Sequence, residues 1–124
     1  MQAGFLPNWK LLKATLYHSG AKGVGGRDSL GCRPVPLRTV AVDPTLIPRR
    51  TILFIAETVG MPLPGGRTHD GYWYASDTGG AIKGARIDLF TGRGHASMGS
   101  AQAFNLKKLS ISPAGHFVGC PPQR

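Results

Sequence analysis

Glycine and proline divide this chain into short pieces, and this limits the folds open to it. The 124 residues include 18 glycines and 10 prolines, and the hydrophobic residues, 41% of the total, lie in runs too short for a helical bundle. Frequent turns between short apolar runs are typical of β-rich proteins. A chain of this length forms one ordinary domain that buries about two thirds of its unfolded surface. We therefore expect a single domain that is mainly β.

Six segments have the alternation, or the β-branched and aromatic content, of strands. They are residues 13–18, 39–42, 51–58, 72–77, 86–90 and 106–112. Few two-residue hairpin turns connect them, which favours a small closed barrel with crossover connections, because closure removes unpaired strand edges. The small residues of segment 95–103 predict a short helix. Segment 20–38, rich in Gly and Pro, predicts a mobile surface loop.

The charge is strongly basic, with 15 Lys and Arg against six Asp and Glu, a net charge of +9. Such a surface attracts polyanions, whether nucleic acid, anionic lipid headgroups or an acidic wall polymer. The basic residues are dispersed, with only two adjacent pairs, Arg49-Arg50 and Lys107-Lys108, so we expect no nucleic-acid partner. A basic surface that serves only solubility remains the alternative.

Cys32 and Cys120 have neither the CxxC nor the Cys/His spacing of a metal or redox site. They predict one disulfide that ties the C-terminal tail to an early loop, which implies an oxidising compartment. Two unrelated thiols are the alternative.

No apolar run is long enough to span a membrane, and the N-terminal residues lack the charged start and apolar core of a secretory signal. Taken literally, this places the protein in the cytoplasm. We favour a chain from which the leader is absent, and a location in the periplasm or elsewhere in the cell envelope. We expect a monomer without a transmembrane segment.

Asp77 and Asp88 are two of the six acidic residues, and they lie on either side of a glycine-rich turn. Because Ile87 and Leu89 occupy one face of a strand, Asp88 lies on the opposite face. The glycines between the two aspartates allow the backbone to turn tightly and to approach a ligand closely. They are Gly79, Gly80 and Gly84. This spacing can bring both carboxyl groups to one cleft.

Two stretches of the sequence resemble the 3D domain family, which is named for three aspartates. They are Val40-Ala-Val-Asp43-Pro-Thr-Leu-Ile-Pro48 and Asp77-Thr-Gly-Gly-Ala-Ile-Lys-Gly-Ala-Arg-Ile-Asp88-Leu-Phe90, in which Asp43, Asp77 and Asp88 match the triplet. The likeness extends over about residues 13–111. It implies a six-stranded double-psi β-barrel with one or two short helices, similar to that of membrane-bound lytic transglycosylase A. Residues 13–112 would form the barrel, with an N-terminal extension at 1–12 and a C-terminal tail at 113–124.

The resemblance implies a protein that acts on peptidoglycan or a related wall polysaccharide, with Asp88 as the catalytic residue and Asp77 as its support. A lytic transglycosylase needs one carboxyl group, which acts first as an acid toward the leaving oxygen and then as a base toward a hydroxyl group of the substrate. Partial burial and the charge of Asp77 should raise the pKa of Asp88. A non-catalytic wall-binding module is the alternative, because the larger transglycosylase has a second domain that completes its groove.

Seven residues are candidates for binding the substrate: Thr15, Tyr17, Asp43, Thr78, Gly79, Gly80 and Lys83. Lys83 either binds substrate carboxylates or favours the ionised forms of the aspartates. Structural roles are the alternative for two aspartates, with Asp43 capping a turn and Asp77 accepting N–H groups of the Gly79-Gly80 loop. Among the aromatic residues at 72–74, Trp73 is expected in the core, although the run could also stack on sugar rings.

The sequence contains no motif for metal binding, for catalysis by a nucleophilic serine or for phosphate binding. The four histidines are scattered without metal-ligand spacing, no serine lies in a nucleophile elbow, and the glycine loop at 79–84 lacks the ending of a phosphate loop. We expect no metal and no cofactor. One departure from the family is Pro48-Arg-Arg50-Thr, where many relatives have Pro-x-Gly-Thr. This turn forms without glycine and can direct a cation toward the cleft.

Overall fold

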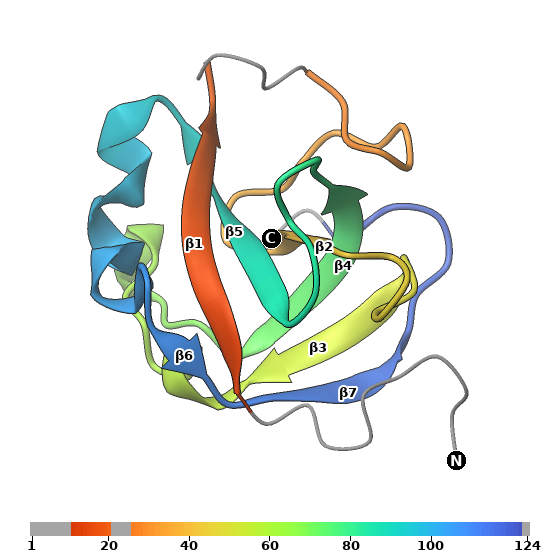
Figure 1. Cartoon of the computed structure of the whole chain (residues 1–124). Helices are drawn as coiled ribbons and strands as arrows, with labels where there is room; N and C mark the ends of the chain where they lie inside the picture. Colours follow the sequence, from red (N-terminus) through yellow and green to blue (C-terminus); the bar gives the residue numbers. More distant parts are fainter. Residues whose placement is uncertain (1–10, 21–25, 123–124) are drawn as a thin grey trace.

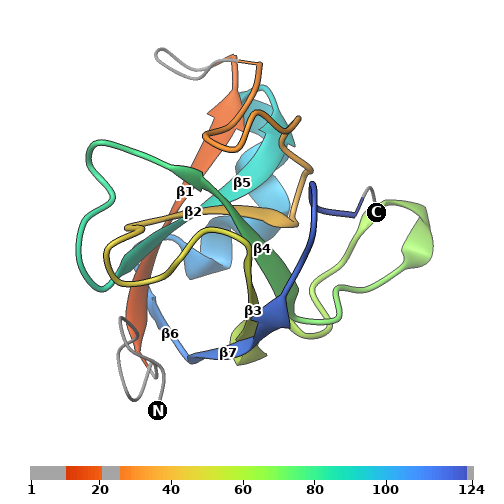
Figure 2. The same cartoon turned by 90° about the vertical axis from the view of Figure 1, so that its right-hand side faces the viewer.

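The computed structural model describes residues 11–20 and 26–122, which form a curled, barrel-like sheet (Figures 1 and 2). The described residues contain seven strands: β1 Leu12–Ser19, β2 Thr39–Val42, β3 Thr51–Ile55, β4 Tyr72–Thr78, β5 Arg86–Arg93, β6 Lys108–Leu109 and β7 Ile111–His116. Three 3-10 helices accompany them: η1 Ala56–Thr58, η2 Pro64–Gly66 and η3 His95–Phe104. The expectation of a mainly β fold is confirmed.

The sheet has the order β6-β1-β5-β2-β4-β3-β7, and its two edge strands are consecutive in the chain. β6 pairs with β1, and β7 pairs with β3. One segment therefore reaches both edges of the sheet, interrupted at Ser110. The backbone N–H and the hydroxyl group of Ser110 donate instead to Glu57. The expected sixth strand is thus two strands, which is why the count is seven rather than six.

Other boundaries differ from the sequence expectation in a similar way. The third strand ends at Ile55 rather than residue 58, because Ala56–Thr58 turns into η1, where the hydroxyl group of Thr58 donates to the Ile55 carbonyl. The expected helix over 95–103 is the 3-10 helix η3. No helix among the residues described is long and apolar enough to cross a membrane.

The core lies on one face of the curled sheet, where alternate residues of each strand point inward. Its members from four strands are Leu12, Ala14, Val40, Val42, Trp73, Ala75, Ile87 and Leu89. Trp73 is fully buried, as alternation predicts. Two parallel strand pairs, β1 with β5 and β2 with β4, bring these residues together. The register of these pairs also determines which residues are neighbours on the opposite face of the sheet.

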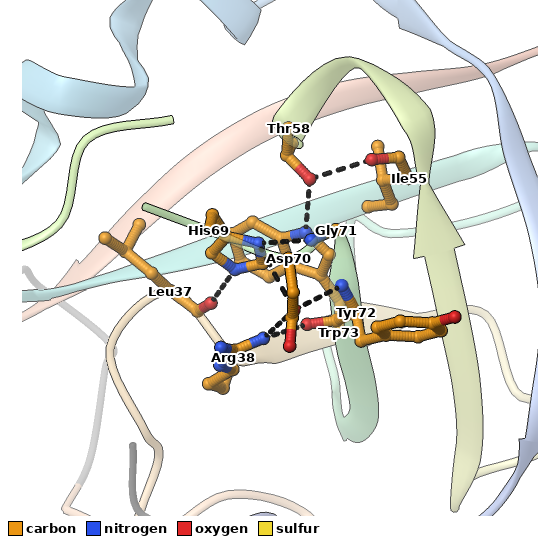
Figure 3. A network of polar contacts seen from close by, with 9 residues as sticks. All are labelled: Leu37, Arg38, Ile55, Thr58, His69, Asp70, Gly71, Tyr72 and Trp73. Atoms are coloured by element: carbon orange, nitrogen blue, oxygen red, sulfur yellow. Dashed lines mark hydrogen bonds and ion pairs between the residues drawn. The ribbon is translucent and has the colours of Figure 1, made fainter. Parts of the chain in front are cut away.

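A buried histidine links the core to the connection between β3 and β4 (Figure 3). His69 Nε2 lies 2.6 Å from the Leu37 carbonyl, and His69 Nδ1 accepts the backbone N–H of Gly71 at 2.8 Å. A ring nitrogen that accepts a hydrogen bond carries no proton, so the ring is neutral and forms no ion pair with Asp70, 3.8 Å away. The ring stacks on Trp73, with 4.7 Å between centroids.

The other face of the sheet is partly covered by segment 26–38 and by the C-terminal tail. A disulfide between Cys32 and Cys120 joins the two segments. The described part of the expected surface loop is not wholly exposed, because Cys32, Val35 and Leu37 are buried. Residues 21–25 of that loop, residues 1–10 of the expected extension and residues 123–124 of the tail lie outside the described residues.

Candidate active site

Four neighbouring strands align a row of residues across the second face of the sheet. Thr15 of β1 pairs with Asp88 of β5, Asp88 pairs with Ala41 of β2, and Ala41 pairs with Asp77 of β4. Partners in such ladders point to the same side. Asp77 and Asp88 therefore share one face, separated by one strand, with about 10 Å between their backbones. The small side chain of Ala41 lies between them.

Asp77 reaches this face through a β-bulge. Val40 pairs with Ala75 and Ala41 with Asp77, so that Ser76 is an extra residue in β4. Because Val40 and Ala41 point to opposite faces, Ala75 and Asp77 do so as well, although regular alternation would place them on the same face. The bulge thus turns Asp77 out of the core and toward Asp88. Bulges that reorient a side chain are common beside active sites.

Asp88 is half-buried between two fully buried neighbours, Ile87 and Leu89. Its Oδ1 accepts a hydrogen bond of 3.0 Å from the hydroxyl group of Thr15. Burial is the largest influence on its pKa and raises it. The charge of Asp77 adds to this rise, while the Thr15 hydrogen bond and the Arg86 guanidinium oppose it. The net effect keeps the acid form to a higher pH than an exposed aspartate would.

Asp77 is held firmly by three donors. Its Oδ2 accepts the phenol hydroxyl of Tyr17 at 2.9 Å, and its Oδ1 accepts the backbone N–H groups of Ser29 and Thr78 at 3.1 and 2.8 Å. Within the part of the chain that is described, these replace the expected donors from the Gly79-Gly80 loop. Burial, reinforced by the charge of Asp77, raises the pKa of Tyr17 and keeps this phenol a donor.

Segment 26–38 docks directly onto the bulge. The hydroxyl group of Ser76 donates a short hydrogen bond to Asp28, and the hydroxyl group of Ser29 donates to the Ser76 carbonyl at 3.1 Å. Asp28 also accepts the backbone N–H of Cys32. Two consecutive loop residues thus bind two consecutive strand residues, and the disulfide begins four positions later. The loop holds Asp77 in place.

Asp43, the third aspartate of the triplet, shapes the turn after β2. Its Oδ1 accepts the backbone N–H and the hydroxyl group of Thr45, and its Oδ2 accepts the N–H of Gly84 at 2.8 Å. These bonds, that of Gly84 first, lower the pKa of Asp43 to about 2. With both oxygens occupied, Asp43 ties the turn to the loop before β5. Gly84 has a φ of +70°, which favours glycine there.

The remaining candidates for substrate binding are spread around the row. Thr78 ends β4, Gly80 and Lys83 are exposed in the following loop, and the Gly79 carbonyl accepts the N–H of Ile82. The charge of Lys83 acts on Asp43. The cation that acts on Asp88 is Arg86, two residues before it on the same strand face.

Three residues of the site, Ser29, Arg49 and Arg86, were not among the sequence candidates. Arg49 Nη1 donates to the carbonyl of Ser29 at 3.2 Å, so a cation from the glycine-free turn does lie beside the loop that holds Asp77. Arg50 takes the position of the family glycine with a φ of +74°, and its Nε donates to the Gly119 carbonyl. Two of these residues had a signal in the sequence: Arg86 precedes Asp88 by two residues along one strand, and Arg49 belongs to the glycine-free turn.

Among the described residues, no three His, Cys, Asp or Glu side chains are grouped so that they could hold a metal ion. The row of residues presents two carboxyl groups, a hydroxyl group and a phenol.

Comparison with known structures places the fold among lytic transglycosylases. A membrane-bound lytic murein transglycosylase from Agrobacterium tumefaciens is 27% identical, with a TM-score of 0.53, over 71% of this chain and 25% of that one. The lytic transglycosylase LtgG of Burkholderia pseudomallei is 29% identical, with a TM-score of 0.50, over 75% of this chain and 28% of that one. E. coli MltA with bound chitohexaose is 23% identical, with a TM-score of 0.51, over 74% of this chain and 29% of that one.

The matched region therefore spans less than a third of each of these three transglycosylases. No protein of curated function matches the sequence significantly. The family model of the 3D domain matches residues 38–103, more than half of the chain, and includes all three aspartates of the triplet. The chain belongs to the 3D domain family.

Proposed function

We propose that this protein acts on peptidoglycan in the cell envelope and cleaves its glycan strands as a lytic transglycosylase, with Asp88 as the general acid and base. The observation that carries the proposal is the half-buried Asp88 on the same face as Asp77, with its pKa raised. A carboxylic acid that stays protonated can donate a proton to the oxygen of a glycosidic bond.

The reaction needs only one such group. Neutral Asp88 donates its proton to the leaving oxygen as the glycosidic bond breaks. The resulting Asp88 carboxylate then accepts the proton of a hydroxyl group on the same sugar, whose oxygen attacks the anomeric carbon and closes an anhydro ring. No water is consumed, and the acid form of Asp88 is restored.

The neighbours of Asp88 suit both halves of this cycle. The hydroxyl group of Thr15 stabilises the carboxylate that exists after the first step. The charge of Asp77 favours the protonated form before that step, and a negative charge near the anomeric carbon stabilises the positive charge that develops there. Tyr17 and Ser29 fix the position of Asp77.

The structural relatives support a glycan as the ligand. MltA, which shares the fold, has been solved with chitohexaose. The disulfide between Cys32 and Cys120 supports an oxidising compartment such as the periplasm or the cell exterior.

A wall-binding protein that does not cleave is the second candidate. It is favoured by the short match, which covers less than a third of each of the larger transglycosylases. A smaller protein surface offers fewer contacts with which to bind and distort a glycan strand.

The test uses purified peptidoglycan sacculi with the wild-type protein and the Asp88→Asn variant. Mass spectrometry of the released material detects anhydro-muropeptides, and co-sedimentation measures retention on the wall. We expect products from the wild type alone and retention of both proteins. Retention of both proteins without products from either would support the wall-binding candidate. If the wild type released no products and was not retained on the sacculi, a wall function would be refuted.

A further inference from the structure

A second charged feature lies on the same face of the sheet as Asp88, farther along β1 and β5. Ser19, Phe90 and Gly92 of these strands line a cavity of about 260 Å³ together with residues of segment 26–38. Two arginines, Arg33 and Arg93, are part of its wall. In Figure 2 the orange segment, which carries Arg33, lies beside the ends of β1 and β5.

A second β-bulge brings Arg93 onto this face. Tyr17 pairs with Phe90, but Ser19 pairs with Arg93, so β5 contains one residue more than β1 over this interval. Tyr17 and Ser19 are two residues apart and point to the same side, so their partners Phe90 and Arg93 do as well. Without the extra residue, Arg93 would point to the opposite side from Asp88.

The bulge depends on Gly92. Its φ is +136°, and a Cβ atom there would lie 3.2 Å from the Cβ of Ser97. Arg33, on the other wall, follows directly on the disulfide-bonded Cys32, so a covalent link fixes its backbone. Both arginines are thus positioned by local features of the chain rather than scattered over its surface.

Neither arginine has an acidic partner among the described residues. All six Asp and Glu side chains of the chain lie in its described parts, and the ion pair found there joins Arg38 to Asp70. The remaining carboxylates accept hydrogen bonds from other groups. Two guanidinium groups at one cavity repel each other until an anion binds, and a carboxylate fits their planar donors.

The cavity also has apolar walls, formed by Pro34, Pro36 and Phe90. A ligand that meets both requirements has a carboxylate and small apolar groups, as a short peptide does. The strand rise places Arg93 about 15 Å from Asp88 along β5. A glycan strand that runs along β5 over Asp88 would carry its peptide substituents past this cavity.

The geometry points to a subsite, defined by Arg33 and Arg93, that binds the carboxylates of the peptides attached to the wall glycan. This inference rests on the proposed function, since it assigns the substituents that the same substrate presents beside the cleavage site. It predicts that peptide-bearing wall material is preferred to a neutral glycan such as chitohexaose.

The test measures binding in the Asp88→Asn background, so that it does not depend on cleavage. Arg33→Gln and Arg93→Gln are compared, singly and together, with Arg67→Gln, which removes one charge from an exposed position outside this cavity. Co-sedimentation uses intact sacculi and sacculi whose carboxylates have been converted to amides. Circular dichroism and thermal unfolding verify that each variant is folded.

We expect the double variant to bind intact sacculi about tenfold more weakly, as loss of about 1.4 kcal/mol implies, and Arg67→Gln to change little. Amidation of the sacculi should also weaken the binding of the parent protein about tenfold, and it should abolish the difference between the parent and the double variant.

Equal binding of the parent and the double variant to intact sacculi would overturn the subsite while leaving the proposed function intact. A difference that persists on amidated sacculi would overturn the carboxylate assignment and indicate wall phosphates instead. Failure of the parent to bind either material would refute the proposed function and, with it, this ligand.

Discussion

The phenol hydroxyl of Tyr17 donates a hydrogen bond of 2.9 Å to Asp77, although β5 and β2 lie between their strands in the sheet. Such a contact requires the sheet to curl strongly enough for β1 and β4 to approach each other. Tyr17 thus connects β1, which carries Thr15, with β4, which carries Asp77. These are the first and last strands of the row of site residues.

Replacing Tyr17 with Phe should remove this connection without removing the ring, which packs against Phe90 with 5.2 Å between centroids. Hydrogen bonds to charged groups contribute about 1.5 kcal/mol or more, so the free energy of unfolding should fall by about that amount. Because Asp77 is then no longer held by this hydrogen bond, the cleavage rate should also fall about tenfold. Urea unfolding and product release from sacculi measure the two effects, with Tyr72→Phe, at an exposed tyrosine, as the control. Unchanged activity in Tyr17→Phe would show that the position of Asp77 is unimportant.

Thr15→Val tests the acid–base role of Asp88 through its pH dependence. The hydroxyl group of Thr15 stabilises the carboxylate and so opposes the rise in the pKa of Asp88. Without that hydroxyl group the pKa of Asp88 should rise further. The alkaline limb of the activity profile, where Asp88 loses its proton, should therefore move to higher pH. Thr15→Ser should restore the wild-type limb, and a limb that stays in place in Thr15→Val would assign it to another group.

Asp88→Asn should unfold at a higher temperature than the wild type at pH 7. Because burial raises the pKa of Asp88 above its value in the unfolded chain, the folded state binds its proton more tightly. Stability from this group is therefore greatest below the unfolded pKa of about 3.9 and is lost as the pH rises through the folded pKa. The neutral amide avoids that loss. Thermal unfolding at pH 7 and pH 3 measures it, and the difference between the proteins should shrink at pH 3. A less stable variant at pH 7 would mean that the charged form of Asp88 is well satisfied in the fold.

The sequence was sufficient to predict most of the strands, because alternation reports which face of a strand is buried. Ile87 and Leu89 identify the core face of β5, and their parity correctly places Asp88 on the other face. The same rule fails for Asp77. Regular alternation from Trp73 would put Asp77 in the core, and only the bulge at Ser76 reverses it.

Bulges and split strands escape sequence reasoning because they depend on contacts between distant segments. Ser76 is extra because Asp28, 48 positions earlier, binds its hydroxyl group. Ser110 divides the last strand because Glu57 accepts its donors, 53 positions away. Neither partner has a local signature. Spacing and the family resemblance predicted that Asp77 and Asp88 lie near each other, whereas the contact of Ser29 with Asp77 and that of Arg49 with Ser29 required coordinates.

The buried His69 should make the protein less stable in weak acid. Desolvation lowers the pKa of His69 in the folded state below the unfolded value of about 6.5, so the unfolded chain binds a proton first. Stability is fully present above pH 6.5 and falls below it, by at most about 1.4 kcal/mol per pH unit. Urea unfolding between pH 5 and 8 should give this slope for the wild type and for His116→Gln, at an exposed histidine. It should give a smaller slope for His69→Gln, and equal slopes in all three proteins would place the titration elsewhere.

The disulfide should contribute both to the stability of the fold and to the position of Asp77. It links Cys32 and Cys120 across 88 positions, and in the chain-entropy account closing so long a loop stabilises the fold by about 4 kcal/mol. Its loss in a Cys32→Ser, Cys120→Ser double variant should also loosen segment 26–38, whose Asp28 and Ser29 hold the bulge and Asp77. We expect lower stability in urea and, at temperatures where the variant is fully folded, a lower cleavage rate with unchanged retention on sacculi. If the folded variant instead cleaved at the wild-type rate, the bonds from Asp28 and Ser29 would be sufficient to hold Asp77, and the disulfide would serve stability alone.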